Sequence, residues 1–347
     1  MSLALLGKLK PTGAWRLGPD SGSRDRVDRI VHSDTWFSAL TAAFAQLGWR
    51  DEWLEATTQT AQPAVRLSSV FFGLDDALLV PAPATLWPPP NPSGKLRVEG
   101  AHFIPASLVG QLAAGVPLHE DQWEVDGYSG CLLRRGRKSS RTGPYRVALR
   151  SQAAVDRLEP GRIAVHQSAC IEWAESAYLW FVAEFAGDEA QQQWAARLES
   201  ALRLLGDSGV GGKRSNGWGH FTIDSVTSGE LPQLVTGSPR QNNGDTEAAP
   251  PAEVSYWLLS LFCPGENDQI DWTRGSFSLL QRGGRVESPA GWGVEKKTLR
   301  MVREGSILLA AQPPSGSAPD VAPDGFAHPV YRNGFAVSIP LPWRVNV

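Results

Sequence analysis

A glycine-rich stretch near residue 210 combines the residue types that bind a polyanion. Residues 207–219 contain five glycines, two adjacent cations followed directly by the small hydrogen-bonding residues Ser215 and Asn216, and one tryptophan. Glycine lets the backbone approach a ligand closely and presents peptide N–H groups to an anion. Lysine and arginine supply charge for phosphates, and an aromatic ring can stack on a base. The candidate polyanion-binding residues here are Gly209, Gly211, Gly212, Lys213, Arg214, Ser215, Asn216, Gly217 and Trp218.

This stretch matches neither of two common phosphate-binding motifs. A P-loop would need a glycine in place of Asp207 and a serine or threonine in place of Arg214. A dinucleotide-binding fingerprint follows a strand, whereas this stretch follows a predicted helix. The residues alone leave two interpretations open. One is a binding loop for a polyanion, and the other is a helix-to-strand turn in which Trp218 packs in the core.

A second concentration of positive charge lies between residues 134 and 150. This run holds seven basic residues and no acidic one. Charge runs are usually solvated faces, but this one falls inside a long irregular stretch, where a protruding basic hairpin is plausible. The candidate phosphate contacts on that hairpin are Arg134, Arg135, Arg137, Lys138 and Arg141.

The tripeptide His32-Ser33-Asp34 stands at the predicted start of a helix. A histidine beside a hydroxyl and a carboxylate raises the idea of a general base, but adjacent residues rarely face one another productively. Ser33 or Asp34 capping the helix, with His32 bonded locally, is the favoured interpretation. A further interpretation is that this helix start contacts a phosphate, which adds His32 and Ser33 to the RNA-binding candidates.

No residue pattern indicates a metal site or a cofactor. Cys131, Cys170 and Cys263 lie far apart, without the paired spacing of a zinc site or of a disulfide framework. The acidic pair Asp75 and Asp76 has no partner cluster and is expected in an exposed turn. The histidines are scattered, so neither a catalytic nor a metal-binding set can be assembled.

The overall composition is that of a globular protein with a local binding surface. Of 347 residues, 42% are apolar and 20% charged, and the net charge of −3 argues against a uniformly basic nucleic-acid binder. A few placed cations still suffice for phosphate contacts. The apolar runs are too short to span a bilayer, and the N-terminus does not read as a signal peptide, so the cytoplasm is the expected location.

The elements around these candidates predict a split βαβ module. A strand over residues 2–9 precedes an amphipathic helix over 33–48, whose apolar stripe comprises Trp36, Phe37, Leu40, Phe44 and Leu47. Residues 65–80 are expected to be strand or buried loop. A buried strand over 177–185, an amphipathic helix over 188–205 and a strand over 220–226 follow. This order is typical of a ferredoxin-like domain, here over residues 1–226 with an insertion at about 81–150.

A linker is expected to divide the chain. Residues 227–252 are rich in glycine, proline, asparagine and serine. A second module over 253–347 then begins with a strand at 254–262 and ends with the segment 334–343. The predicted class is therefore α+β, in two domains.

Several ordered segments resemble RAMP-superfamily CRISPR proteins. Residues 209–221, Gly-Val-Gly-Gly-Lys-Arg-Ser-Asn-Gly-Trp-Gly-His-Phe, closely resemble the glycine-rich loop of that superfamily. Other segments resemble the fourth subunit of the type III-A (Csm) effector: residues 32–40, 67–73 followed by 79–83, 155–157, 304–306 and 328–335. The loop alone points to the superfamily, and the ordered set points to this subunit.

The resemblance implies two ferredoxin-like (RRM-like) modules, the first with a thumb-like hairpin, and no catalytic site of its own. It implies a ribonucleoprotein subunit for antiviral defence that binds the 5′ repeat-derived handle of the CRISPR RNA (crRNA). The implied protein partners are the large cyclase/polymerase-like subunit and the first RAMP backbone subunit. The family's RNA-binding loop maps onto Gly209 to Gly219, and its hairpin onto the insertion.

Two other functions remain open from the sequence. One is a RAMP endoribonuclease that processes precursor crRNA, with His32 as general base and Lys213 stabilising the developing charge. The other is a structural subunit whose glycine-rich loop packs against a neighbouring protein.

Overall fold

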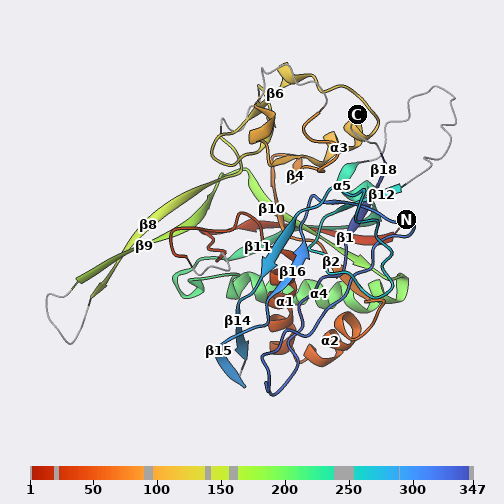
Figure 1. The fold of residues 1–347 in the computed structure, drawn as a ribbon. Helices are drawn as coiled ribbons and strands as arrows, with labels where there is room; N and C mark the ends of the chain where they lie inside the picture. Colours follow the sequence, from red (N-terminus) through yellow and green to blue (C-terminus); the bar gives the residue numbers. More distant parts are fainter. Residues whose placement is uncertain are drawn as a thin grey trace.

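The computed structural model describes residues 2–18, 23–89, 97–136, 142–155, 163–237, 254–288 and 290–343. The chain folds as an α+β protein, as predicted, around a seven-stranded antiparallel sheet (Figure 1). The order in this sheet is β11-β1-β10-β3-β4-β5, and β2 also pairs with β10. The strands are β1 (Ser2–Pro11), β2 (Val65–Leu67), β3 (Phe71–Leu74), β4 (Ala77–Pro81), β5 (Phe103–Pro105), β10 (Ala177–Phe185) and β11 (Phe221–Leu231).

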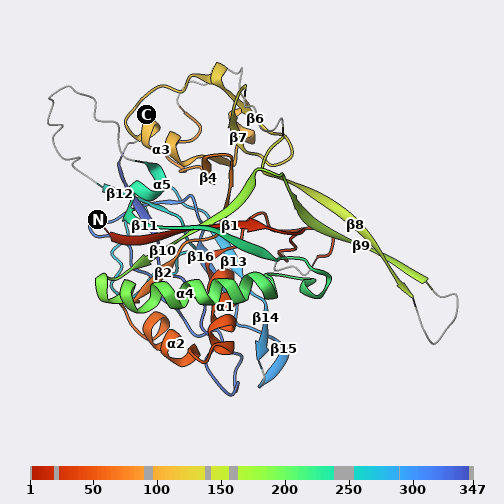
Figure 2. The same ribbon diagram turned by 180° about the vertical axis from the view of Figure 1, so that it is seen from behind.

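Three helices lie together beside this sheet, as Figure 2 shows. They are α1 (Ser33–Gln46), α2 (Arg50–Thr58) and α4 (Asp188–Ser208). The predicted stripe of α1 is confirmed, because Trp36, Phe37, Leu40 and Phe44 are all buried. The Phe44 ring stacks on Trp53 of α2 with 4.5 Å between centroids and meets Trp194 of α4 edge-on. Full burial of one such side chain contributes about 1.5–3 kcal/mol to stability.

The insertion between β4 and β10 carries its own small elements. These are η1 (Val98–Gly100), β5, α3 (Ala106–Ala113), η2 (Glu120–Gln122), β6 (Trp123–Val125) and β7 (Leu132–Arg134). A long hairpin of β8 (Tyr145–Val155) and β9 (Ile163–Trp173) then projects from the body (Figure 1). The hairpin extends beyond the predicted end of the insertion near residue 150, because β8 pairs in register with β9 from Tyr145↔Trp173 to Val155↔Ile163.

The predicted linker begins too early. Strand β11 continues to Leu231, which pairs with Ser2 at the start of β1, and α5 (Gln233–Thr236) follows. The length of β1 is the physical reason, since its hydrogen-bonding groups are satisfied by an equally long partner. The rest of the predicted linker, residues 238–252, lies outside the described residues.

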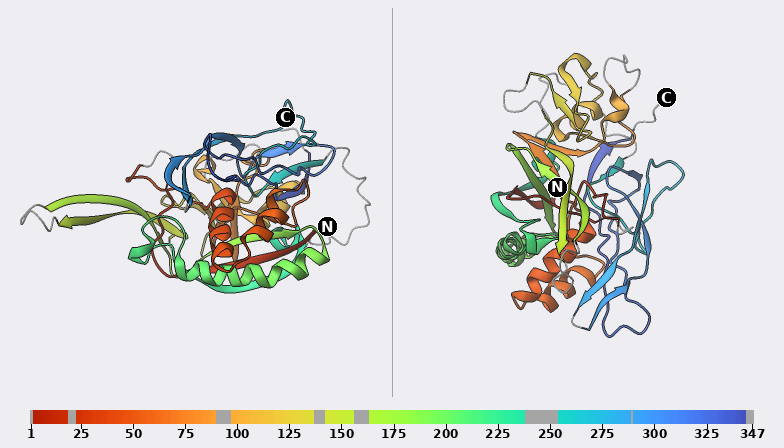
Figure 3. Two further views of the ribbon diagram at one scale, coloured as in Figure 1. Left: turned by 90° about the horizontal axis from the view of Figure 1, so that it is seen from below. Right: turned by 90° about the vertical axis from the view of Figure 1, so that its left-hand side faces the viewer.

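The C-terminal region consists of short strands beside the N-terminal region. Figure 3 shows them (blue) on one side, with α4 on the other. Two small sheets and a hairpin form from β12 (Val254–Leu258), β13 (Leu279–Arg282), β14 (Arg285–Ser288), β15 (Gly291–Glu295), β16 (Leu299–Val302), β17 (Ile307–Leu309) and β18 (Ser338–Pro342).

The second ferredoxin-like module is not seen in this region. Residues 254–288 and 290–343 contain no helix, whereas a βαββαβ module needs two. The strands bury their apolar side chains against the N-terminal region instead, and Trp257, Ile307 and Ile339 belong to the same hydrophobic cluster as Trp36. In the described part of the chain, no helix is long and apolar enough to cross a membrane.

Candidate nucleic-acid interface

The glycine-rich loop connects α4 to β11, as predicted, and its backbone needs glycine. Gly211 and Gly219 have φ of 84° and 81°, in the left-handed region. A β-carbon at Gly211 would lie 2.3 Å from the Arg16 carbonyl oxygen, and one at Gly219 would lie 2.0 Å from that of Val210. Any other residue would therefore push the loop away from the segment beneath it.

That segment is residues 12–17, which leads from β1 toward α1. The Gly212 N–H donates to the Arg16 carbonyl at 2.8 Å, and the Gly219 N–H donates to the Ala14 carbonyl at 2.9 Å. The Thr12 N–H donates to the His220 carbonyl at 3.0 Å. The loop is therefore held by its own backbone, which leaves several of its side chains free to point outward.

The outer part of the loop borders an open depression of about 560 Å³. Arg214, Ser215 and Asn216 are exposed and form the short helical turn η3 (Arg214–Asn216). Lys213 precedes this turn and is half-buried, with φ of 61°. The depression is lined by Asp207, Ser208, Gly211, Lys213, Arg214, Ser215 and His220. A flexible polyanion could reach two cations and two small polar side chains in this depression. The carboxylate of Asp207 adds one negative charge to its lining.

Trp218 does not lie where a base could stack on it. Its side chain is 6% exposed and packs with Ala14 and Cys170. Arg150 lies over its ring at 5.7 Å from the centroid, and Lys213 at 5.8 Å. The predicted stacking role is therefore wrong for this conformation of the loop. Trp218 instead joins the loop to the base of the β8–β9 hairpin, where such cation–π contacts add stability.

The hairpin brings more cations beside the loop. The Lys213 ammonium donates to the Gln152 amide oxygen on β8. Arg146 and Arg150 share the carboxylate of Glu172 on β9, at 2.9 Å and 2.8 Å. Hydrogen bonds from Arg150 and Arg146 hold the pKa of Glu172 below its usual value. One carboxylate thus orients two exposed guanidiniums and leaves this face of the hairpin basic.

The predicted basic contacts before the hairpin lie elsewhere. Arg134 ends β7 and pairs in register with Trp123, and the Arg135 guanidinium donates to the Trp123 carbonyl at 2.8 Å. Both residues are exposed on the β6–β7 ribbon of the insertion and not on the hairpin. Arg137, Lys138 and Arg141 lie outside the described residues. Among the described residues of the basic run, the cations on the hairpin are the last two, Arg146 and Arg150, which the sequence analysis did not select.

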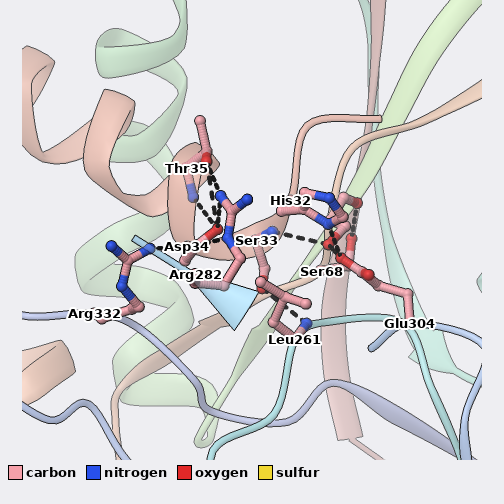
Figure 4. Close-up of polar contacts among 10 residues, drawn as sticks. His32, Ser33, Asp34, Thr35, Ser68, Leu261, Arg282, Glu304 and Arg332 are labelled. Carbon is pink, nitrogen blue, oxygen red and sulfur yellow. Dashed lines mark hydrogen bonds and ion pairs between the residues drawn. The ribbon is translucent and has the colours of Figure 1, made fainter. Parts of the chain in front are cut away.

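His32 and Ser33 face the interior. They are 5% and 0% exposed, so neither can contact RNA in this conformation. Figure 4 shows the His32 Nδ1 paired with the Glu304 carboxylate, at 2.8 Å. The Ser33 hydroxyl accepts from the Leu261 N–H at 3.0 Å and makes no helix cap, because His32 is the N-cap residue and its side chain makes no capping bond. The predicted capping of the helix by Ser33 or Asp34 is therefore wrong, and His32 and Ser33 are not accessible to RNA in this conformation.

Asp34 completes this interior polar cluster. The Arg282 guanidinium donates to both carboxylate oxygens at 3.0 Å, and Arg332 donates to one of them (Figure 4). Burial alone would raise the pKa of Asp34, but Arg282 and then Arg332 outweigh it and hold that pKa at about 2. The cluster connects α1 to the C-terminal region. Its partners Arg282, Glu304 and Arg332 could not be found from spacing, since they stand some 250 or more residues from α1.

The described residues contain no group of three or more His, Cys, Asp or Glu side chains arranged to hold a metal ion. Cys131 and Cys170 are buried and Cys263 is half-buried, and none of the three forms a disulfide. Burial raises the pKa of Cys170 and of Cys263 above the usual value, which keeps them protonated at neutral pH.

A family model and a related protein both match this chain. Residues 252–341 match the family model described as the CRISPR Csm4 C-terminal domain. The sequence is 21% identical to the CRISPR system Cms protein Csm4 of Methanocaldococcus jannaschii, over 97% of this chain and 98% of that protein.

Two solved structures share the fold. The first is a crystal structure of a Csm3–Csm4 subcomplex in the type III-A CRISPR–Cas interference complex, with a TM-score of 0.60 and 16% identity over 99% of this chain and 100% of the matched chain. The second is a Csm1–Csm4 cassette in complex with cA4, with a TM-score of 0.56 and 17% identity over 99% of each chain. Because the sequence identities are so low, these two matches show a shared fold and nothing more.

Proposed function

We propose that this Csm4-like type III CRISPR protein is a non-catalytic subunit of a Csm effector complex and holds the 5′ repeat-derived handle of the crRNA. The observation that carries the proposal is the glycine-rich loop, which exposes Arg214, Ser215 and Asn216 and borders an open depression lined by Lys213, Arg214 and Ser215 among others. In this proposal the subunit works in a cytoplasmic ribonucleoprotein for antiviral defence.

The loop would bind the RNA backbone through charge and local hydrogen bonds. Arg214 is exposed and can meet a phosphate with a two-pronged contact. Lys213 can exchange the neutral Gln152 amide for a phosphate, since a charged acceptor makes the stronger hydrogen bond. Ser215 and Asn216 can donate to phosphate, sugar or base edges. Arg146 and Arg150 extend the same basic surface along the hairpin.

The proposal includes a ferredoxin-like N-terminal module. The strand order β11-β1-β10-β3 supports it. In a βαββαβ module, the first strand of the second βαβ repeat lies beside the first strand of the first repeat, and here β10 lies beside β1 in that way. Helix α1 follows β1, and α4 follows β10, in the positions that the module requires. The hairpin β8–β9 would act as the thumb of this module.

The subunit would also bridge two kinds of protein partner. The structural relatives were solved with Csm3 and with Csm1. By analogy we propose that this chain joins a backbone subunit to the large cyclase/polymerase-like subunit. The described surface holds exposed apolar side chains that such contacts could cover, including Trp272, Phe277 and Leu279 in the C-terminal region.

A catalytic role for His32 has no support from its surroundings. A general base must reach the proton that it removes. The His32 ring is buried and bonded to Glu304, within the cluster that joins α1 to the C-terminal region. Labelled repeat RNA incubated with the purified protein should stay intact, and cutting that is lost in His32→Ala would overturn the non-catalytic part of the proposal.

The binding proposal is tested by Lys213→Ala combined with Arg214→Ala. Affinity for handle RNA should fall, and the slope of log K against log salt should lose about one to two units, because two phosphate contacts disappear. The melting temperature should fall only slightly, since Arg214 is exposed and Lys213 loses one hydrogen bond to Gln152 and one cation–π contact with Trp218. Arg203→Ala is the matched control, because Arg203 is an exposed arginine of α4 that pairs with Glu199. Equal affinity in the double variant and the control would contradict the proposal.

A further inference from the structure

Three basic side chains from distant parts of the chain meet at one exposed place. Arg29 lies just before α1, His102 lies just before β5 in the insertion, and Arg303 follows β16 in the C-terminal region. All three are exposed. Neither the glycine-rich loop nor the hairpin contributes to this group.

Gly130 shows how closely two of them approach. A β-carbon on Gly130 would lie 3.0 Å from the His102 ring and 3.5 Å from an Arg29 guanidinium nitrogen. The backbone N–H of His102 donates to the Gly130 carbonyl at 2.9 Å, which holds the two residues side by side. Arg29 also hydrogen-bonds the Tyr145 hydroxyl at the base of the hairpin. The glycine therefore leaves room for an imidazole and a guanidinium side by side.

Arg303 is brought to the same place by a tight turn. The Ala84 N–H donates to the Gly305 carbonyl at 3.1 Å, and the Ala82 N–H donates to the His102 carbonyl at 3.2 Å. The turn therefore lies against the chain that carries His102. Within the turn, Glu304 is buried on His32, whereas Arg303 is exposed. One residue of the turn thus anchors it while its neighbour faces solvent.

The charges that act on the imidazole are of one sign. Burial lowers the pKa of His102, and the positive charges of Arg29 and then Arg303 lower it further. No carboxylate contributes to that shift. Both guanidiniums suit the oxygens of a phosphate.

The backbone connects this group to the glycine-rich loop. The Gly212 N–H donates to the Arg16 carbonyl, and the Asp28 N–H donates to the Leu17 carbonyl at 3.1 Å. The segment that supports the loop is thus joined directly to the residue before Arg29. An RNA strand that leaves the loop along this segment would pass the cluster next.

We propose that Arg29, His102 and Arg303 form a second phosphate site, which binds the backbone of the same RNA strand beyond the glycine-rich loop. This inference rests on the function proposed above. It commits to a phosphodiester ligand, since two guanidiniums and a ring N–H offer several donors to one tetrahedral anion. The site would fix the direction in which the handle leaves the loop.

The test uses the full chain and a 5′ handle RNA titrated at several salt concentrations. Arg29→Gln with Arg303→Gln should weaken binding about three- to tenfold and reduce the salt slope by about 0.7, the value for one phosphate of a single strand. The matched control is Arg50→Gln with Arg203→Gln, which makes the same change in net charge at two ion-paired arginines of α2 and α4. Melting temperatures are compared throughout. If Arg29→Gln unfolds the protein through its Tyr145 contact, Arg303→Gln with His102→Gln replaces it.

RNA length separates this inference from the proposed function. With an RNA shortened until it covers the glycine-rich loop alone, the cluster variant should bind as tightly as the unsubstituted protein, while the Lys213 and Arg214 variant remains weakened. Unchanged binding of full-length handle RNA by the cluster variant would overturn the second site and leave the loop proposal standing. The binding of an acidic peptide to the cluster variant is measured in parallel. If the cluster variant loses more affinity for the peptide than for the RNA, the site binds a protein, and the inference of a second phosphate site is overturned. Failure of the unsubstituted protein to bind handle RNA would remove both proposals.

Discussion

The glycine-rich loop and the start of α1 carry similar side chains and use them in opposite ways. Both combine positively charged or hydrogen-bonding groups with small residues. In the loop, Arg214, Ser215 and Asn216 face solvent, and backbone hydrogen bonds together with the buried Trp218 hold the segment in place. At the start of α1, His32, Ser33 and Asp34 are buried and bonded to the C-terminal region. Burial therefore decides whether such a cluster binds a ligand or holds the fold together.

The largest effect expected from this difference is at Asp34. Asp34→Ala would leave the buried guanidiniums of Arg282 and Arg332 without their carboxylate, which should cost about 3–5 kcal/mol of unfolding free energy. Urea unfolding measures this loss. Asp51→Ala is the control, because the Arg50–Asp51 pair is exposed and should change stability by less than about 1 kcal/mol. Similar stabilities for the two variants would show that the buried cluster does not hold the regions together.

Trp218 tests the border between the two kinds of region. The Trp218 side chain is buried between the loop and the hairpin, so Trp218→Ala should lower the unfolding free energy by about 3 kcal/mol. Trp272→Ala should cost much less, because the Trp272 side chain is 41% exposed. Unchanged stability in Trp218→Ala, together with lost RNA binding, would instead favour a tryptophan that turns outward to stack on a base.

A smaller and pH-dependent effect is expected at the His32–Glu304 pair. Burial alone would lower the pKa of His32, but Glu304 raises it above the usual value. Burial alone would raise the pKa of Glu304, but His32 and Ser69 lower it. The His32 contribution is therefore complete below about pH 6.5 and is lost as the pH rises through the raised pKa. The Glu304 contribution is present above about pH 4.5 and is lost as the pH falls.

Glu304→Gln should remove this dependence. The variant should lose about 1–3 kcal/mol of unfolding free energy near pH 5 to 6, and its curve of stability against pH should be flatter than that of the unsubstituted protein. Unfolding titrations at a series of pH values measure both. Parallel curves would mean that the two groups are not ionised as a pair.

Much of the N-terminal fold could be predicted from local pattern. The pattern of apolar residues predicts the buried stripe of α1, the buried strand β10 and the amphipathic helix α4. The glycine-rich loop was expected between a helix and a strand, where the structure has it. The hairpin was less visible, because Arg146 and Arg150 of β8 continue the run of basic residues that begins at Arg134 and were read as part of that charge run. Its partner β9 follows 8 residues later in the chain, and only pairing shows the register.

The errors at the candidate site have a common physical origin. His32, Ser33 and Trp218 have residue types that suit RNA, but their burial depends on segments far away in the sequence. The second module was expected by resemblance, whereas the C-terminal strands are short and complete their core against the N-terminal region. The residue pattern of a single sequence shows which faces of a helix or strand are apolar, but not which distant segments of the chain cover those faces.

Crosslinking most directly tests the claim that the exposed loop grips the RNA. A handle RNA carrying a photoreactive nucleotide would be bound to the full chain, irradiated and mapped by mass spectrometry. The account predicts crosslinks within residues 211–217 that disappear in the Lys213→Ala and Arg214→Ala variant. Crosslinks confined to other surfaces, with none at the loop, would contradict it.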